Sequence, residues 1–157
     1  MQTSQAGFDL IKTFEALRLD AYLCPAGFWT IGWGHTADVN EGMRITQTQA
    51  EQFLRDDVRQ IDAALPAVVR MPLTQGQHDA LASLCFNLRG GAARLPKIAP
   101  RLVARIDAGD FSGAAGELLD IDRANGVVLP GLTRRREAER ALFVAAPSGN
   151  PGTVSSL

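Results

Sequence analysis

A carboxylic acid, a thiol and a hydroxyl group stand close together in the segment FEALRLDAYLCPAGFWTIGWGHT, at Glu15, Cys24 and Thr30. Such groups can donate a proton, attack a substrate or hold a water molecule. The same segment contains several glycines, which allow tight turns or the close approach of a ligand, and the aromatic residues Trp29 and Trp33. This combination favours a site that cleaves a sugar polymer.

Each of the three residues also has an ordinary structural interpretation. Glu15 ends a helical pattern beside Phe14, where a partly dry pocket would help the carboxyl group keep its proton, but it could equally be a solvated surface residue. Cys24 could be an activated thiol or a small buried hydrophobic side chain. Thr30 could hold a water or a substrate hydroxyl, or simply occupy a β-strand.

His35 offers two further interpretations. A Cys24–His35 pair would suit a thiol hydrolase, but that reading lacks a third, orienting group and leaves Glu15 unexplained. Zinc ligation by His35, His78 and the cysteines is disfavoured because no two of them have close metal-ligand spacing. We therefore expect neither a metal nor a cofactor.

The composition excludes several classes of protein. The chain has 157 residues, the size of one ordinary domain, and its 16 basic and 17 acidic residues give a net charge of −1. This balance argues against general nucleic-acid binding. No apolar run approaches the roughly 20 residues that span a bilayer, and the N-terminus lacks a secretory signal pattern, so we expect no stable membrane insertion and synthesis in a cytoplasm. The two cysteines, Cys24 and Cys85, are expected to be unpaired.

The pattern along the chain predicts a small sheet followed by helices. Apolar spacing predicts a helix over 3–14, with Ser4 as a possible cap, and alternation with turn residues predicts strands at 18–23, 28–33 and 42–45. Capping-box spacing predicts helices that begin after Thr46 and Thr74. The first should end at Pro66 and the second at Gly90 and Gly91.

The rest of the chain predicts shorter helices. They are expected from about 100 to before 109, over 111–120, and from Thr133, as a cap, to about 145. Residues 126–131 read as a turn-rich link. The Pro-, Gly- and Ser-rich segment 146–157 reads as a flexible tail.

The spacing of Glu15, eight residues, Cys24, five residues and Thr30 resembles the Glu–(Asp or Cys)–Thr triad of the tailed-phage lysozymes, a family of glycoside hydrolases. Further motifs strengthen the resemblance, which covers about residues 4–145: WTIGWGHT, TQTQAEQFLRDDV, LTQGQHDALASLCFNL, DAGDFSGAA and LPGLTRRREAERALF. The segment DIDRANGVVLP departs from many relatives, which have a tryptophan before the glycine turn.

The resemblance implies a lysozyme-like α+β fold that is mainly α. It would form a single domain over 1–145: a β lobe at about 15–45, a connecting helix at 46–65, and a helical lobe at 66–145 that includes the helix 3–14. The implied reaction is hydrolysis of the β-1,4 bond between N-acetylmuramic acid and N-acetylglucosamine in peptidoglycan.

The resemblance also implies residue roles. Glu15 would protonate the leaving oxygen. Cys24, where many members have aspartate, would activate a water or attack the sugar directly, and Thr30 would help to hold that water. His35 and Asp57 would form an ion pair between the lobes. Arg134 would approach Glu15, unless Arg135 or Arg136 takes that place. Cleft-lining residues would be Gly34, Leu88 and Asn125.

The implied partner is peptidoglycan, with the protein acting as a monomeric endolysin. Variants of the family with a cysteine include endolysins that begin with a signal-arrest-release segment. This chain shows no such segment, so we expect release from the cytoplasm to the periplasm through a holin. The alternatives are a non-catalytic wall-binding or virion-associated module of the same fold, and an antibacterial toxin with the same chemistry.

Overall fold

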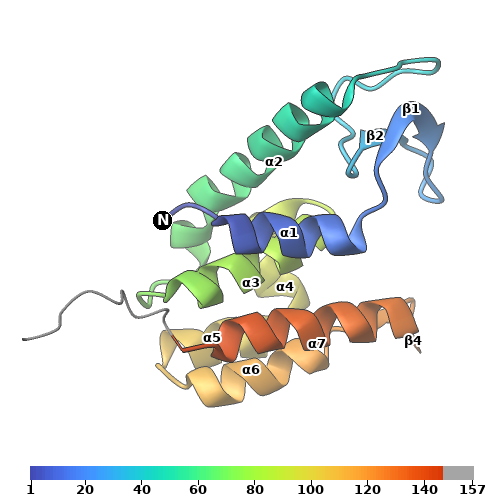
Figure 1. Cartoon of the computed structure of the whole chain (residues 1–157). Coiled ribbons are helices and arrows are strands. Elements are labelled where there is room, and N and C mark those ends of the chain that lie inside the picture. Colours follow the sequence, from blue (N-terminus) through green and yellow to red (C-terminus); the bar gives the residue numbers. More distant parts are fainter. Residues whose placement is uncertain (147–157) are drawn as a thin grey trace, which may run out of the picture.

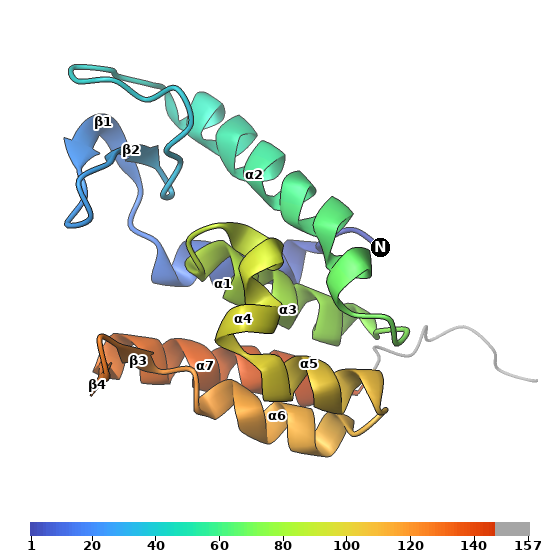
Figure 2. The ribbon, with the colours of Figure 1, turned by 180° about the vertical axis from the view of Figure 1, so that it is seen from behind.

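The computed structural model describes residues 1–146, and most of the predicted tail at 146–157 lies outside them. A small antiparallel sheet of β1 (Arg18–Leu23) and β2 (Trp29–Gly32) lies at one end of the long helix α2 (Gln47–Val68). The helical lobe lies toward the other end, as Figures 1 and 2 show from opposite sides. The fold is therefore α+β and mainly helical, as predicted.

The β lobe is smaller than the sequence predicted. In the sheet, Tyr22 pairs with Thr30 and Leu23 with Trp29, so the first two strands are confirmed. The third predicted strand, at 42–45, is wrong: it makes only an isolated bridge between Asp20 and Arg44, flanked by two backbone hydrogen bonds. Residue 42 is a glycine with φ of 77°, and α2 begins directly after Thr46, so little extended chain remains to form a strand.

The connecting helix α2 begins as predicted but continues past its proline. Thr46 and Gln49 form the expected capping box. The prediction that Pro66 ends the helix is wrong, because the helix runs to Val68. A proline removes one backbone donor, and near the end of a helix this costs a single hydrogen bond. The backbone N–H of Val69 still bonds to the oxygen of Leu65 at 2.9 Å and closes the last turn.

The helical lobe contains the remaining elements. They are α1 (Gln5–Phe14), α3 (Gln75–Asn87), the 3-10 turn η1 (Gly91–Arg94), α4 (Leu95–Ile98), α5 (Pro100–Asp107), α6 (Phe111–Leu119), the hairpin of β3 (Arg123–Ala124) and β4 (Val127–Val128), and α7 (Pro130–Val144). The capping box at Thr74 is confirmed, whereas Ser4 makes no side-chain cap. Ser4 instead donates its hydroxyl to Asp79.

Two predictions near the last helix are corrected. Thr133 does not cap α7: the helix begins at Pro130 after Leu129, and the Thr133 hydroxyl donates to Asp122 Oδ2 at 3.0 Å. Proline suits the first turn because its missing donor has no helical partner there. The link predicted at 126–131 is partly the β3–β4 hairpin, whose turn places Asn125 and Gly126 in the left-handed region at φ of 51° and 80°.

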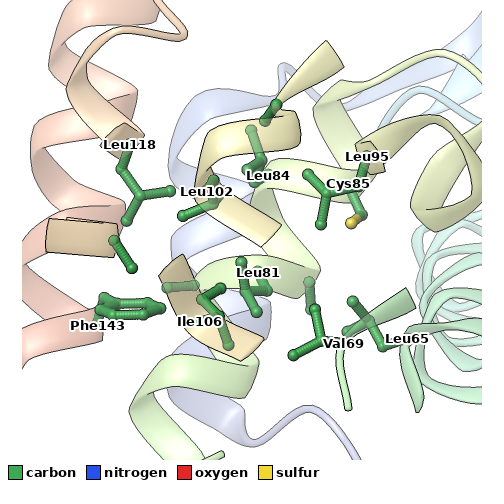
Figure 3. Packing of buried hydrophobic residues seen from close by; sticks show 14 of the residues in the cluster. Leu65, Val69, Leu81, Leu84, Cys85, Leu95, Leu102, Ile106, Leu118 and Phe143 are labelled. Atoms are coloured by element: carbon green, nitrogen blue, oxygen red, sulfur yellow. The ribbon is translucent and has the colours of Figure 1, made fainter. Parts of the chain in front are cut away.

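Two clusters of buried hydrophobic side chains form the cores of the two lobes. The larger unites α2 with α3 and α5–α7, and its labelled members in Figure 3 include Leu81, Leu84, Ile106 and Phe143. The smaller packs β2 against α1 and the first half of α2. Phe86 contacts both clusters, so the end of α3 is fixed relative to the β lobe. No helix within residues 1–146 has the length and apolarity to cross a bilayer.

Candidate active site

A cleft of about 980 Å³ brings together the three residues whose chemistry the sequence singled out. Glu15, Cys24 and Thr30 all line it. Gly34 and Leu88 lie on its wall, where the sequence placed them. Asn125 is exposed in the turn of the β3–β4 hairpin and is not among the residues that line this cleft, so its place in the substrate site stays a prediction.

Glu15 is the C-cap residue of α1, and its side chain is held by Arg135 of α7. Its backbone N–H still bonds to the oxygen of Ile11, while its own φ and ψ are extended, so the side chain leaves the helix toward the cleft. Arg135 Nη1 donates to Glu15 Oε1 at 2.6 Å. The side chain of Glu15 is 24% exposed, whereas that of Arg135 is 3% exposed. The contact is thus formed from the protein interior.

The prediction that Arg134 approaches Glu15 is corrected to Arg135. Arg134 is exposed, whereas Arg135 and Arg136 are buried on the face of α7 that packs against α3. On a helix each residue is rotated by about 100° from the one before it, so only part of a run of three arginines can face the core.

A buried carboxylate, Glu139, lies one turn further along α7 and joins both arginines. Its Oε1 accepts from Arg135 Nε at 3.2 Å and from Ser83 Oγ at 2.8 Å, and its Oε2 lies 2.8 Å from Arg136 Nε. Burial raises the pKa of Glu139, and the charges of Arg136 and Arg135 oppose that rise. The network therefore stabilises the ionised form of a carboxyl group that burial alone would neutralise.

The network reaches the cleft at a second point. Arg136 Nη2 donates to Asn87 Oδ1 at 3.0 Å, and Asn87 lines the cleft beside Leu88. Sequence reasoning missed Glu139, Ser83 and Asn87. Glu139 follows Arg135 by four positions and Arg136 by three, a spacing that brings side chains together on a helix and could have indicated the contact.

Cys24 lies in the turn between β1 and β2. Its N–H donates to the oxygen of Phe28 at 2.9 Å, and its own oxygen accepts from Gly27 at 2.8 Å. Gly27 has φ of 83°, which a side chain would disfavour. The backbone amide of Phe28 lowers the pKa of the Cys24 thiol most, with desolvation opposing it and the Thr30 hydroxyl and Arg89 charge adding to it. The turn thus favours the reactive thiolate.

Thr30 is buried in β2, and its hydroxyl group lies beside the turn that holds Cys24. The group donates to the oxygen of Phe28 at 3.0 Å, the same carbonyl that accepts from the Cys24 N–H. Its oxygen retains lone pairs that can accept a hydrogen bond from another molecule. Cys24 and Thr30 are therefore positioned by a single turn.

The expected pair of His35 and Asp57 is confirmed. His35 Nδ1 lies 2.9 Å from Asp57 Oδ2, and its ring stacks on Phe53 with 4.4 Å between centroids. The hydrogen bond to Asp57 raises the pKa of His35, with desolvation opposing it. Because the ring is engaged with Asp57 and does not line the cleft, the Cys24–His35 hydrolase interpretation finds no support.

The second cysteine is an inert core residue. Burial raises the pKa of the Cys85 thiol to about 12, and both cysteines are free thiols, as expected. Within residues 1–146, no group of three or more His, Cys, Asp or Glu side chains is arranged to hold a metal ion.

The comparison with known proteins decides the family. The family model described as "Phage lysozyme" matches residues 12–139. The chain belongs to the phage lysozyme family. The chain is 47% identical over 150 residues to the endolysin of Acyrthosiphon pisum secondary endosymbiont phage 1, a match that covers 93% of this chain and 100% of the relative.

Two further matches extend the likeness. The muramidase domain of SpmX from Asticaccaulis excentricus has a TM-score of 0.83 and 39% identity, covering 92% of this chain and 99% of that domain. The SAR-endolysin of Escherichia phage P1 is 31% identical over 150 residues, covering 90% of this chain and 81% of the relative. The lysozyme-like fold is confirmed, and the protein is a glycoside hydrolase that lyses peptidoglycan as a muramidase.

Proposed function

We propose that Glu15, Cys24 and Thr30 carry out the hydrolysis, at the β-1,4 bond between N-acetylmuramic acid and N-acetylglucosamine. One observation supports this above all: the three side chains line one cleft, Glu15 held by Arg135, and Cys24 and Thr30 positioned by one turn through the Phe28 carbonyl. Glu15 is the general acid, Cys24 acts on the other face of the sugar, and Thr30 positions the water.

The surroundings of Glu15 leave one carboxyl oxygen open to a bulky leaving group. Arg135 occupies Oε1 and leaves Oε2 for the substrate. A Cβ placed on Gly34 would lie 3.8 Å from that Oε2, so the glycine keeps the space beside it open. In the reaction Glu15 gives its proton to the glycosidic oxygen as the bond from the anomeric carbon to that oxygen breaks.

Cys24 then has two possible actions, and we favour the activation of water. The thiolate takes one proton from a water molecule whose other hydrogen is donated to the hydroxyl oxygen of Thr30. The resulting hydroxide attacks the anomeric carbon with inversion. Direct attack by sulfur would instead form a thioglycosyl intermediate and end in retention. NMR of the first-formed product separates the two: the α-anomer supports activation of water, and the β-anomer contradicts it.

Substitution of Cys24 tests its role, with the inert thiol removed. In a Cys85→Ala background, alkylation of Cys24 with iodoacetamide should abolish the release of reducing ends from purified peptidoglycan. Cys24→Ser should lose most activity because a hydroxyl is a far weaker base, whereas Cys24→Asp should retain part of it. Full activity of the alkylated protein would remove Cys24 from the mechanism.

We further propose that the endolysin acts as a monomer, since Glu15, Cys24 and Thr30 of one chain line the same cleft, and that it passes from the cytoplasm to the periplasm through a holin. Expression with and without a holin gene tests this: lysis of the culture without a holin would contradict it, and sedimentation tests the monomer.

A further inference from the structure

Arg89 reaches across the cleft from the helical lobe to the β lobe. Its guanidinium carbon lies 4.0 Å from the centroid of the Phe28 ring, and both residues line the cleft. A guanidinium group at this distance over an aromatic face makes a favourable cation–π contact. The charge of Arg89 is therefore held at a defined place, although the side chain itself is exposed.

The backbone after α3 directs Arg89 to this position. The helix ends at Asn87, and the N–H of Leu88 bonds back to the oxygens of Leu84 and Cys85. Gly90 and Gly91 follow with φ of 91° and 60°, so the chain turns sharply into η1. Arg89 thus stands at the tip of a short turn that is fixed on both sides.

Phe28 belongs to the turn that holds Cys24. The oxygen of Phe28 accepts from the N–H of Cys24, and its own amide faces the thiol as the main cause of the lowered pKa of Cys24. A cation resting on the Phe28 ring is consequently placed over the turn that carries the reactive sulfur. Opposite charge favours the ionised form of a nearby acid.

The acidic side chains that line the cleft are paired with cations other than Arg89. Glu15 is paired with Arg135, and Asp57 with His35. Among the ion pairs that residues 1–146 form, none includes Arg89. The Arg89 charge can therefore favour the ionised form of the Cys24 thiol, and it is the smallest of the causes that lower the pKa of that thiol.

We propose that Arg89 is a positioning residue for the reaction: held on Phe28 across the cleft, it favours the thiolate form of Cys24 in the working enzyme. This inference rests on the proposed role of Cys24 in hydrolysis. Arg89 would act through the sulfur, and the Phe28 ring would fix the distance over which it acts.

The rate at which iodoacetamide alkylates Cys24, measured against pH in a Cys85→Ala background, tests the proposal without any substrate. The reagent is neutral, so Arg89 does not attract it. Arg89→Gln should slow alkylation on the acidic side of the titration on the order of twofold to fivefold, the range for an exposed charge pair, and should move the midpoint to higher pH. Arg89→Lys should restore most of the rate. Phe28→Leu, which frees the guanidinium group, should act in the same direction.

Identical alkylation profiles for Arg89→Gln and the parent would overturn the proposal. A double-mutant cycle of activity gives a second measure: Arg89→Gln should cost less activity when Cys24→Asp supplies an already ionised carboxylate. An equal loss in both backgrounds would also overturn it, since Arg89 would then act on the substrate. Failure of the proposed function would give a different result: the protein alkylated at Cys24 would still release reducing ends, while the alkylation rate of Cys24 would still depend on Arg89.

Discussion

Replacing Arg135 with methionine tests the buried network beneath Glu15, and its neighbour Arg134 supplies a matched control. Methionine keeps most of the alkyl stem of arginine and removes the guanidinium group. In Arg135 that group bonds to Glu15 at 2.6 Å, to Glu139 at 3.2 Å and to the oxygen of Ser83 at 3.1 Å, with 3% of the side chain exposed. Arg134 is exposed on the same helix.

The expected cost follows from what remains in the interior. Breaking a buried ion pair costs about 3–5 kcal/mol, because one charge is left without compensation. Here Arg136 stays 2.8 Å from Glu139 Oε2 and retains part of that compensation, so the lower end applies, about 3 kcal/mol. For a domain of this size this corresponds to a fall in the melting temperature on the order of 6–12 °C. Arg134→Met should change stability by no more than about 0.5 kcal/mol.

Urea unfolding followed by circular dichroism measures both variants, and reducing-end release is measured at a temperature at which each is folded. Arg135→Met should also lose activity at least on the order of tenfold, since Glu15 loses the contact that fixes its carboxyl group. Equal stability of the Arg134 and Arg135 variants would refute the network, and wild-type activity of folded Arg135→Met would refute its role in holding Glu15.

Two other predictions concern the frame of the site. Asp57→Asn should destabilise the protein by up to about 1 kcal/mol at pH 5.5 and by less at pH 8.5. The pKa of His35 is raised in the folded protein, so the pair with Asp57 stabilises the fold below the unfolded-state pKa, and this stability is lost as the pH rises through the folded-state pKa. Equal shifts of the urea midpoint at both pH values would contradict this, with Asp56→Asn as the control. Gly76→Ala should destabilise by about 1–3 kcal/mol because its Cβ would lie 2.5 Å from the backbone oxygen of Leu142. Gly116→Ala, with open space around it, should not lower the melting temperature, and similar losses in both would argue against the close contact of α3 with α7.

The local signals in the sequence predicted the elements that depend on local chemistry. Both capping boxes were found because their hydrogen bonds join residues three positions apart. The helix at Pro66 was predicted too short because a proline near the end of a helix removes only one backbone hydrogen bond, and the helix continues to Val68. The third strand was predicted where the structure has only an isolated bridge, because the pattern of residue types does not reveal how far a partner strand runs alongside.

The site was predictable where a motif carried it and not where a buried contact did. The spacing of Glu15, Cys24 and Thr30 predicted that they would meet in one cleft. The choice between Arg134 and Arg135 depends on the rotation of α7 about its axis, which the polar run of three arginines hides. Ser83 and Asn87 were missed because they lie more than 45 residues from their partners, so no local pattern links them.

The most direct test of the account is the release of reducing ends from purified peptidoglycan by folded Glu15→Gln. Glutamine has nearly the shape of glutamate and cannot donate a proton to the glycosidic oxygen. Its oxygen can still accept from Arg135, so the fold should survive, as circular dichroism and the melting temperature would show. The account predicts that release falls to the level of buffer alone. Release at the rate of the unsubstituted enzyme would contradict it.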